Sequence, residues 1–102
     1  MKFNSDFVVI DKLPEPSDVV SINVRHSFPG SLFKELEFYN WLRNAKPLQP
    51  NDEKLLQWNY VPWYSVELVT ASGNYEFNLY RGGLGIVTVP NGSKGAIMFS
   101  LK

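Results

Sequence analysis

The chain has 102 residues, of which 44% are hydrophobic and 15% aromatic, and its ten basic residues balance its ten acidic ones. This length and apolar content suffice for one domain with an ordinary core, which excludes intrinsic disorder. The basic residues are scattered along the chain, which argues against a nucleic-acid partner and against an electrostatic membrane anchor.

The chain contains no cysteine, which excludes disulfides, thiolate metal sites and a cysteine nucleophile. No apolar run approaches the roughly 20 residues that span a bilayer. The longest apolar run near the N-terminus, Phe7–Ile10, is flanked by Asp6 and Asp11 and is too short for a secretory signal. We therefore expect one α+β domain over residues 1–102, located in the cytoplasm.

The N-terminal third predicts one clear strand. Phe7–Ile10 fits either a short strand or a helical turn, and Pro14 and Pro16 end it. Residues 18–26 then alternate between apolar and polar side chains, which predicts a half-buried strand. The side expected to be buried carries Val20, Ile22, Val24 and His26.

Residues 31–45 are rich in helix formers, with Ser31 available as N-cap and Pro47 as the stop. At 100° per residue they form two apolar stripes, whereas a surface helix normally shows one. Either the first turn is irregular, or the helix contacts apolar groups on two sides. A loop follows at 46–57, with room for a helical turn at 51–56. The two stripes are Phe38, Trp41, Leu42 and Ala45, and Leu32, Phe33, Leu36 and Tyr39.

Residues 63–71 and 74–81 flank Ser72-Gly73, a two-residue hairpin signal. Pairing Ala71 with Asn74 places Leu68 opposite Phe77 on an apolar face and leaves the other face polar. This agreement between the two strands favours that register.

A second hairpin is predicted from residues 84–90 and 93–101, which flank the type I′ pair Asn91-Gly92. Its expected pairs are Ile86 with Ile97 and Leu84 with Phe99. Gly82, Gly83 and Gly85 lie between the hairpins and predict a turn or bulge, because no helix follows to form a phosphate loop. The predicted fold is an antiparallel β-meander of four to six strands, with one main α-helix packed on one face.

No group of residues predicts catalysis. His26 is the only histidine and has no evident partner. Glu35 and Glu37 are two positions apart on the helix and diverge. Glu67 and Glu76 share the polar sheet face on a diagonal, with Asn78 expected opposite Glu67, and the small fold offers little cleft for paired carboxylates. We therefore expect a protein that is not an enzyme and has no cofactor and no metal.

The segment 58–64 holds two tryptophans and two tyrosines within seven positions. Tyr64 is expected in the core, and Trp63 on the opposite face near Tyr80. Such rings serve either as core or, where exposed, as a binding hot spot, and both alternatives stay open. The residues predicted to bind a partner are Trp58, Tyr60, Trp63, Tyr80, Arg81, Glu35 and Glu37.

In build, with about a hundred residues, no cysteine, one helix on a meander and no catalytic group, the chain resembles small bacterial immunity proteins. These proteins bind and neutralise a toxin domain. The chain is similar also to compact antitoxin and inhibitor proteins of the same size. The resemblance implies a non-catalytic protein whose partner is another protein, a bacterial toxin. The acidic residues Glu35, Glu37, Asp52 and Glu53 would suit a basic nuclease toxin.

Two alternatives belong to other functional classes. A small apolar or aromatic ligand could bind between helix and sheet, with Trp41, Trp58 or Trp63 lining the pocket. A homodimeric structural protein could instead pair through an edge strand. The expected edge ends at Leu101, because its segment AIMFSL carries no charge and no proline to protect it.

Overall fold

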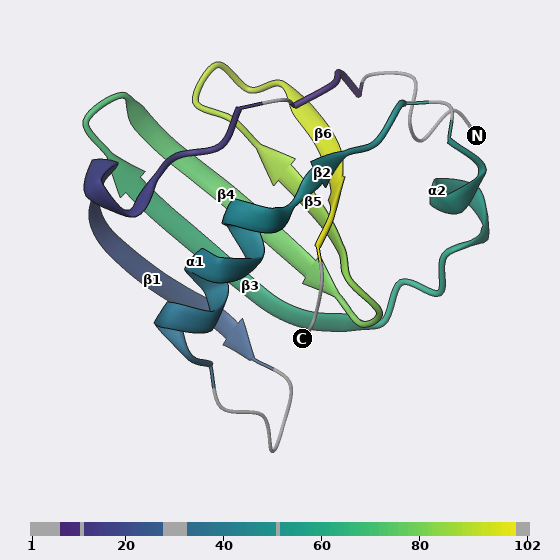
Figure 1. The fold of residues 1–102 in the computed structure, drawn as a ribbon, viewed down its shortest axis with the longest axis horizontal. Coiled ribbons are helices and arrows are strands. Elements are labelled where there is room, and N and C mark those ends of the chain that lie inside the picture. The colour runs from purple at the N-terminus through teal and green to yellow at the C-terminus, as the bar shows by residue number, and fades with distance from the viewer. Residues whose placement is uncertain (1–6, 11, 28–32, 51, 100–102) are drawn as a thin grey trace.

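The computed structural model describes residues 7–10, 12–27, 33–50 and 52–99. One antiparallel sheet dominates the fold, and its six strands lie in the order β1-β3-β4-β5-β6-β2 (Figure 1). The elements in chain order are the 3₁₀ turn η1 (Pro16–Asp18), β1 (Val19–Ser27), α1 (Glu35–Asn44), β2 (Lys46–Pro47), α2 (Glu53–Gln57), β3 (Pro62–Thr70), β4 (Gly73–Tyr80), β5 (Leu84–Thr88) and β6 (Lys94–Met98).

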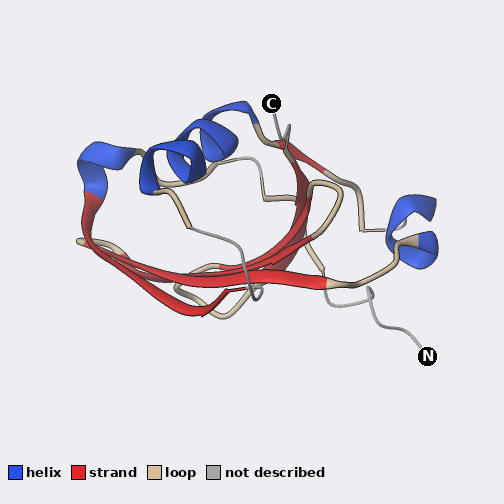
Figure 2. Cartoon of the chain, turned by 90° about the horizontal axis from the view of Figure 1, so that it is seen from below, coloured by secondary structure: helices blue, strands red, loops and turns tan. Residues whose placement is uncertain are grey.

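The sheet is curved, and α1 lies in its concavity, whereas the short α2 lies beyond the sheet on the side away from α1 (Figure 2). The predicted class, an antiparallel meander with one main helix on one face, is confirmed. No helix in the described part of the chain is both long enough and apolar enough to cross a bilayer.

Two apolar clusters lie on opposite faces of the sheet. The inner cluster lies between α1 and the sheet and is centred on Phe38, whose ring is fully buried and meets Phe77 edge to face at 5.4 Å. The outer cluster covers the other face of β5 and β6 and reaches the end of β4 at Tyr80. There Leu84, Ile86 and Ala96 are buried under Phe7, Leu48 and Leu55. The β5–β6 hairpin is therefore buried on both faces, while no described element covers the outer face of β1, β3 and the rest of β4.

For the β3–β4 hairpin, the predicted faces are confirmed, but the predicted register is wrong by two residues. Leu68 pairs with Tyr75, not with Phe77, and the turn is Ala71-Ser72. The Thr70 hydroxyl fixes this turn, because it donates to the Gly73 carbonyl at 2.8 Å and accepts from the Ser72 amide at 3.2 Å. Since the shift is an even number, the side chains of Tyr64–Thr70 and of β4 keep their predicted faces; Trp63, at a further register shift beside Pro62, does not.

For the β5–β6 hairpin, the predicted register is wrong by one residue, and the faces change with it. Ile86 pairs with Ala96 and Leu84 with Met98, so Ile97 turns to the inner cluster while Ile86 and Leu84 turn to the outer one. Because the register is shifted by one residue, this hairpin contributes side chains to both the inner and the outer cluster.

The turn explains the difference. Its loop has three residues, Pro90–Gly92, closed by a bond from the Val89 amide to the Ser93 carbonyl at 2.9 Å. A type I′ turn would need a positive φ at Asn91, and no non-glycine residue of the described chain has one. Pro90 instead fits the first central position of an ordinary turn, and Gly92, at φ 94°, takes the left-handed position that ends it.

Helix α1 begins at Glu35, later than predicted, with Lys34 as N-cap; Ser31 and Leu32 lie outside the described residues. The first stripe is confirmed, since its members at 38, 41 and 42 are buried. Of the second stripe, Phe33 precedes the helix and packs on Phe38 and Tyr64, with ring centroids 5.5 and 5.3 Å apart. The irregular start is therefore the correct alternative for Phe33.

The segment predicted as a loop at 46–57 contains the predicted helical turn, α2, whose N-cap Asp52 accepts from the Lys54 amide at 2.9 Å. It also contains the unpredicted strand β2, which pairs with β6. Farther along β6, the Val8 amide donates to the Lys94 carbonyl at 2.8 Å. The expectation that the strand ending at Leu101 forms an open edge is therefore wrong for its described part, β6, and Leu101 lies outside the described residues.

Strand β1 forms as predicted, but its simple alternation is wrong. Register shifts between Val19 and Ser21, and between Val24 and His26, add a residue at two places. Val19 and Ile22 therefore pack against the inner cluster, while Val20 is 72% exposed.

Candidate protein-interaction surface

The sheet face turned away from α1 presents rows of side chains that the strand register aligns. One row crosses five strands, from Asn23 through Glu67, Glu76 and Thr88 to Lys94. The next row begins polar and becomes apolar where it enters the outer cluster. We call the uncovered polar part on β1, β3 and β4 the outer polar face; it consists of Ser21, Asn23, Arg25, Ser65, Glu67, Asn74, Glu76 and Asn78.

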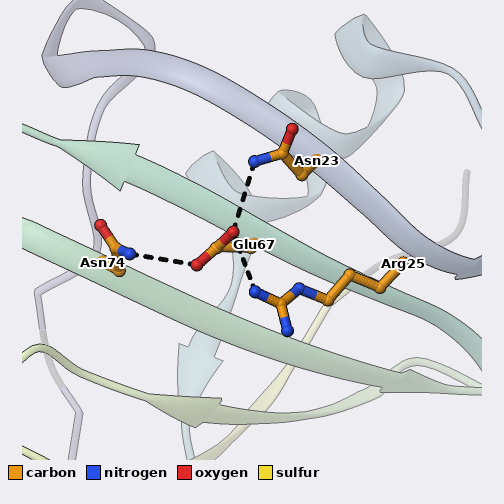
Figure 3. A network of polar contacts seen from close by, with 4 residues as sticks. All are labelled: Asn23, Arg25, Glu67 and Asn74. Carbon is orange, nitrogen blue, oxygen red and sulfur yellow. Dashed lines mark hydrogen bonds and ion pairs between the residues drawn. The ribbon is translucent and has the colours of Figure 1, made fainter.

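Glu67 organises this face (Figure 3). One carboxylate oxygen lies 3.0 Å from the Arg25 guanidinium and accepts from the Asn23 amide at 3.3 Å; the other accepts from the Asn74 amide at 3.0 Å. These neighbours come from β1 and β4, on either side of β3. The Glu67 side chain is 12% exposed, whereas that of Arg25 is 58% exposed. The network therefore holds the Glu67 carboxylate in place, while the Arg25 guanidinium that pairs with it remains exposed to solvent.

Glu67 stands directly opposite Glu76, so the predicted diagonal placement, with Asn78 opposite Glu67, is wrong. Like charges at directly opposed positions destabilise a sheet. The hydrogen bond from Arg25, with smaller contributions from Asn23 and Asn74, offsets this and lowers the pKa of Glu67 below its ordinary 4.5. Glu67 is therefore ionised at neutral pH and accepts hydrogen bonds rather than donating a proton.

This lowered pKa predicts acid sensitivity. A carboxyl whose pKa is lower in the folded than in the unfolded chain contributes stability that is present above 4.5 and lost as pH falls through the folded value. When the pH is lowered from neutral to below 4.5, the urea concentration at half unfolding is expected to decrease for the wild type. It is expected to decrease less for Glu67→Gln. Glu37→Gln, on the exposed side of α1, controls for the loss of a carboxylate. Parallel curves for wild type and Glu67→Gln would refute the role of the network.

Three of the predicted partner-binding aromatics meet at the border of the outer polar face. Tyr60 and Tyr80 pack edge to face, with ring centroids 5.0 Å apart. The Tyr60 hydroxyl donates to the Leu55 carbonyl at 2.6 Å, and the Trp58 indole donates to the Arg81 carbonyl at 3.1 Å. All three rings are half-buried and pack against the outer cluster. Much of the aromatic crowding at 58–64 is therefore explained by this second core.

Of the remaining predicted partner-binding residues, Arg81 is exposed directly after β4, beside Trp58, whereas Trp63, Glu35 and Glu37 lie on the α1 side of the sheet. Trp63 was expected near Tyr80, which is wrong: a register shift beside Pro62 turns its ring to the inner cluster, 5.1 Å from that of Trp41. Glu35 and Glu37 lie exposed on the first turn of α1.

The sequence interpretation missed the other polar residues of the surface. The alternation along residues 63–71 and 74–81 places Ser65, Asn74 and Asn78 on the polar face of the hairpin, but it indicates only contact with solvent and no binding role. Asn23 and Arg25 could not be added, because nothing local indicates that β1 lies beside β3. The pairing is antiparallel and joins segments some forty residues apart.

A pocket of about 360 Å³ lies between Ile10, residues 12–16 and the C-terminal half of α1. Its lining combines Ile10, Leu13 and Leu42 with the charged Lys12 and Arg43. This pocket does not match the ligand site expected between helix and sheet: aromatic rings fill the space between α1 and the sheet, and none of Trp41, Trp58 and Trp63 lines the pocket.

Comparison with known proteins adds no relative. No protein family, no curated protein and no solved structure matches the chain. Among the described residues, no three acidic, histidine or cysteine side chains are grouped as metal ligands would be. The geometry of the outer polar face is therefore the basis for assigning a function.

Proposed function

We propose that this chain is a non-catalytic protein-binding domain that binds and neutralises a bacterial toxin, as small immunity proteins do, through its outer polar face. The observation that carries the proposal is the ordered, uncovered network around Glu67. Side chains from three strands are held there by hydrogen bonds and yet lie open to solvent. Side chains that are ordered before binding lose less entropy when a partner docks.

The composition of the surface supports a protein partner. Arginine and tyrosine are enriched at the energetic centres of interfaces, and short polar side chains supply adaptable hydrogen bonds. Here Arg25 lies 58% exposed, Asn23 and Asn78 are exposed beside it, and Tyr80 borders them. The Ser65 hydroxyl donates to the Asn78 side-chain oxygen at 2.9 Å, so the N–H donors of this exposed side chain remain for a partner's acceptor.

The charge of the surface indicates the partner's chemistry. Arg25 compensates Glu67, so the exposed Glu76 across the strand carries the excess negative charge. A partner that presents lysine or arginine toward Glu76 would complement this face and associate faster at low salt. A basic toxin domain such as a nuclease has this character. Of the four acidic residues predicted to suit such a toxin, Glu35 and Glu37 lie on the α1 side instead, and Asp52 and Glu53 lie at the start of α2.

Glu76→Lys tests the proposal with little risk to the fold. The new ammonium group would face the Glu67 carboxylate, so a repulsive pair becomes an attractive one and the stability is expected to hold or rise. Toxin binding is expected to weaken at least about tenfold, because the partner's cations then meet a cation. Leu36→Lys is the matched control, since it adds the same side chain at a position that is 79% exposed on α1.

The readout is growth. Proteins that the immobilised chain captures from its source cells are each expressed alone and together with the chain. We expect one of them to arrest growth alone and to be neutralised by wild type and Leu36→Lys but not by Glu76→Lys. If none of the captured proteins arrests growth, the proposal that the partner is a toxin is contradicted. If Glu76→Lys restores growth as well as the wild type does, the proposal that the outer polar face binds the toxin is contradicted.

A further inference from the structure

Strand β1 forms an open edge of the sheet. Its nine residues pair on one side only, with β3. At the opposite end of the sheet, β2 and the residue 7–8 segment cover β6. Within the described ranges, β1 is therefore the long edge whose outer backbone groups face solvent.

Several protective features of natural edge strands are missing from β1. Such edges commonly carry lysine or proline, and β1 contains neither. Its one cation, Arg25, is bound to Glu67 on the outer polar face. The strand also exposes two β-branched side chains, Val20 at 72% and Val24 at 41%, and these account for two of the five large exposed hydrophobics of the described chain. Two bulges are the only protection, and they leave Ser21–Val24 regular between them.

The side chains that β1 exposes are complementary under antiparallel self-pairing. If the twofold axis passes through Ile22, Ser21 of one copy stands opposite Asn23 of the other within the regular segment, and Val20 stands opposite Val24 at its ends. Each exposed valine then covers the other, and the Ser21 hydroxyl of each copy lies opposite the Asn23 side chain of the other. A partner strand of unrelated sequence would not place apolar side chains opposite both Val20 and Val24.

We infer that two copies of this chain pair antiparallel through β1 and join their six-stranded sheets into one continuous sheet. The inference does not depend on the proposed function. Asn23 and Arg25 stay on the outer polar face, so pairing brings two such faces side by side on one surface. A dimeric partner, or two partner molecules, would then be bound across the joined sheet.

Mass in solution tests the pairing. Light scattering coupled to size-exclusion chromatography is expected to give twice the 11.7 kDa chain mass for the wild type at high concentration. Val20→Lys is expected to give the single mass, because a charge on the edge opposes pairing. Leu36→Lys and Glu76→Lys, which lie off β1, are expected to keep the double mass. A wild type that is monomeric throughout, or a Val20→Lys variant that is still dimeric, would overturn the inference.

A covalent trap tests the register independently of folding effects. The natural chain has no cysteine, so Val20→Cys/Val24→Cys introduces the only two. Four residues apart on a strand, they are too distant to bridge within one copy, since a disulfide needs Cα atoms within about 7 Å. Mild oxidation is expected to give a linked dimer, whereas Leu36→Cys gives none. Absence of linkage by the double variant would exclude the proposed register. If Glu76→Lys loses toxin binding but stays dimeric, then dimer formation through β1 and toxin binding by the outer polar face are independent properties.

Discussion

Phe38→Ala is expected to lower the free energy of unfolding by about 3–5 kcal/mol, the cost of removing a large buried aromatic ring. Phe38 is the fully buried contact of the main helix with the sheet. Its ring lies edge to face with those of Trp41 at 6.5 Å and Phe77 at 5.4 Å, so truncation leaves a cavity at the centre of the inner cluster. Urea denaturation followed by tryptophan fluorescence measures the loss.

Leu36→Ala provides the control on the same helix. Leu36 is 79% exposed, so its truncation is expected to change the free energy of unfolding by no more than about 0.5 kcal/mol. If both variants lost similar amounts, or if Phe38→Ala cost less than about 1 kcal/mol, the packing of α1 onto the sheet would be contradicted.

Gly83→Ala is expected to cost about 2–4 kcal/mol through two separate causes. Gly83 has φ 107°, a conformation that strains any residue with a Cβ. A Cβ there would also lie 2.5 Å from the Phe99 carbonyl oxygen, which is backbone and cannot move aside cheaply. The Phe99 amide already donates to the Gly83 carbonyl at 2.8 Å, so the two segments are held together. Thermal or urea unfolding measures the loss.

Gly92→Ala separates the two causes. Gly92 has a comparable φ of 94°, but a Cβ there would meet nothing within 4 Å. Its expected cost is therefore the backbone strain alone, about 1–2 kcal/mol. Equal costs at the two glycines would mean that the contact between Gly83 and Phe99 does not constrain the fold.

The spacing of apolar residues, every second position in the strands and every third or fourth in the helix, predicted most of the residues of the inner cluster. The alternation along β3 and β4 identified Val66, Leu68 and Phe77 as core, and the first helical stripe identified Phe38 and Trp41. These predictions depend only on which side of an element each residue occupies. Burial of one face dictates that side strongly, so they hold even where the register is wrong by two residues.

Other features depend on contacts that local patterns do not encode. The β5–β6 register follows from the conformation of the turn at Pro90, and an error of one residue there exchanged the two faces. The outer cluster draws on Phe7, Leu48 and Leu55, which come from segments without strong periodicity. The outer polar face needs the pairing of β1 with β3, and bulges in β1 break the alternation from which its faces were predicted.

The most direct test of the central claim, that the outer polar face binds a protein partner, is site-specific photo-crosslinking in the source cells. A photoreactive amino acid replaces Asn78, which is exposed on β4, or Leu36, which is exposed on α1 at the other side of the sheet. The account predicts that one protein is crosslinked from position 78 and not from position 36, and that this protein is the growth-arresting partner. A partner crosslinked from position 36 alone, or no crosslink from position 78, would contradict it.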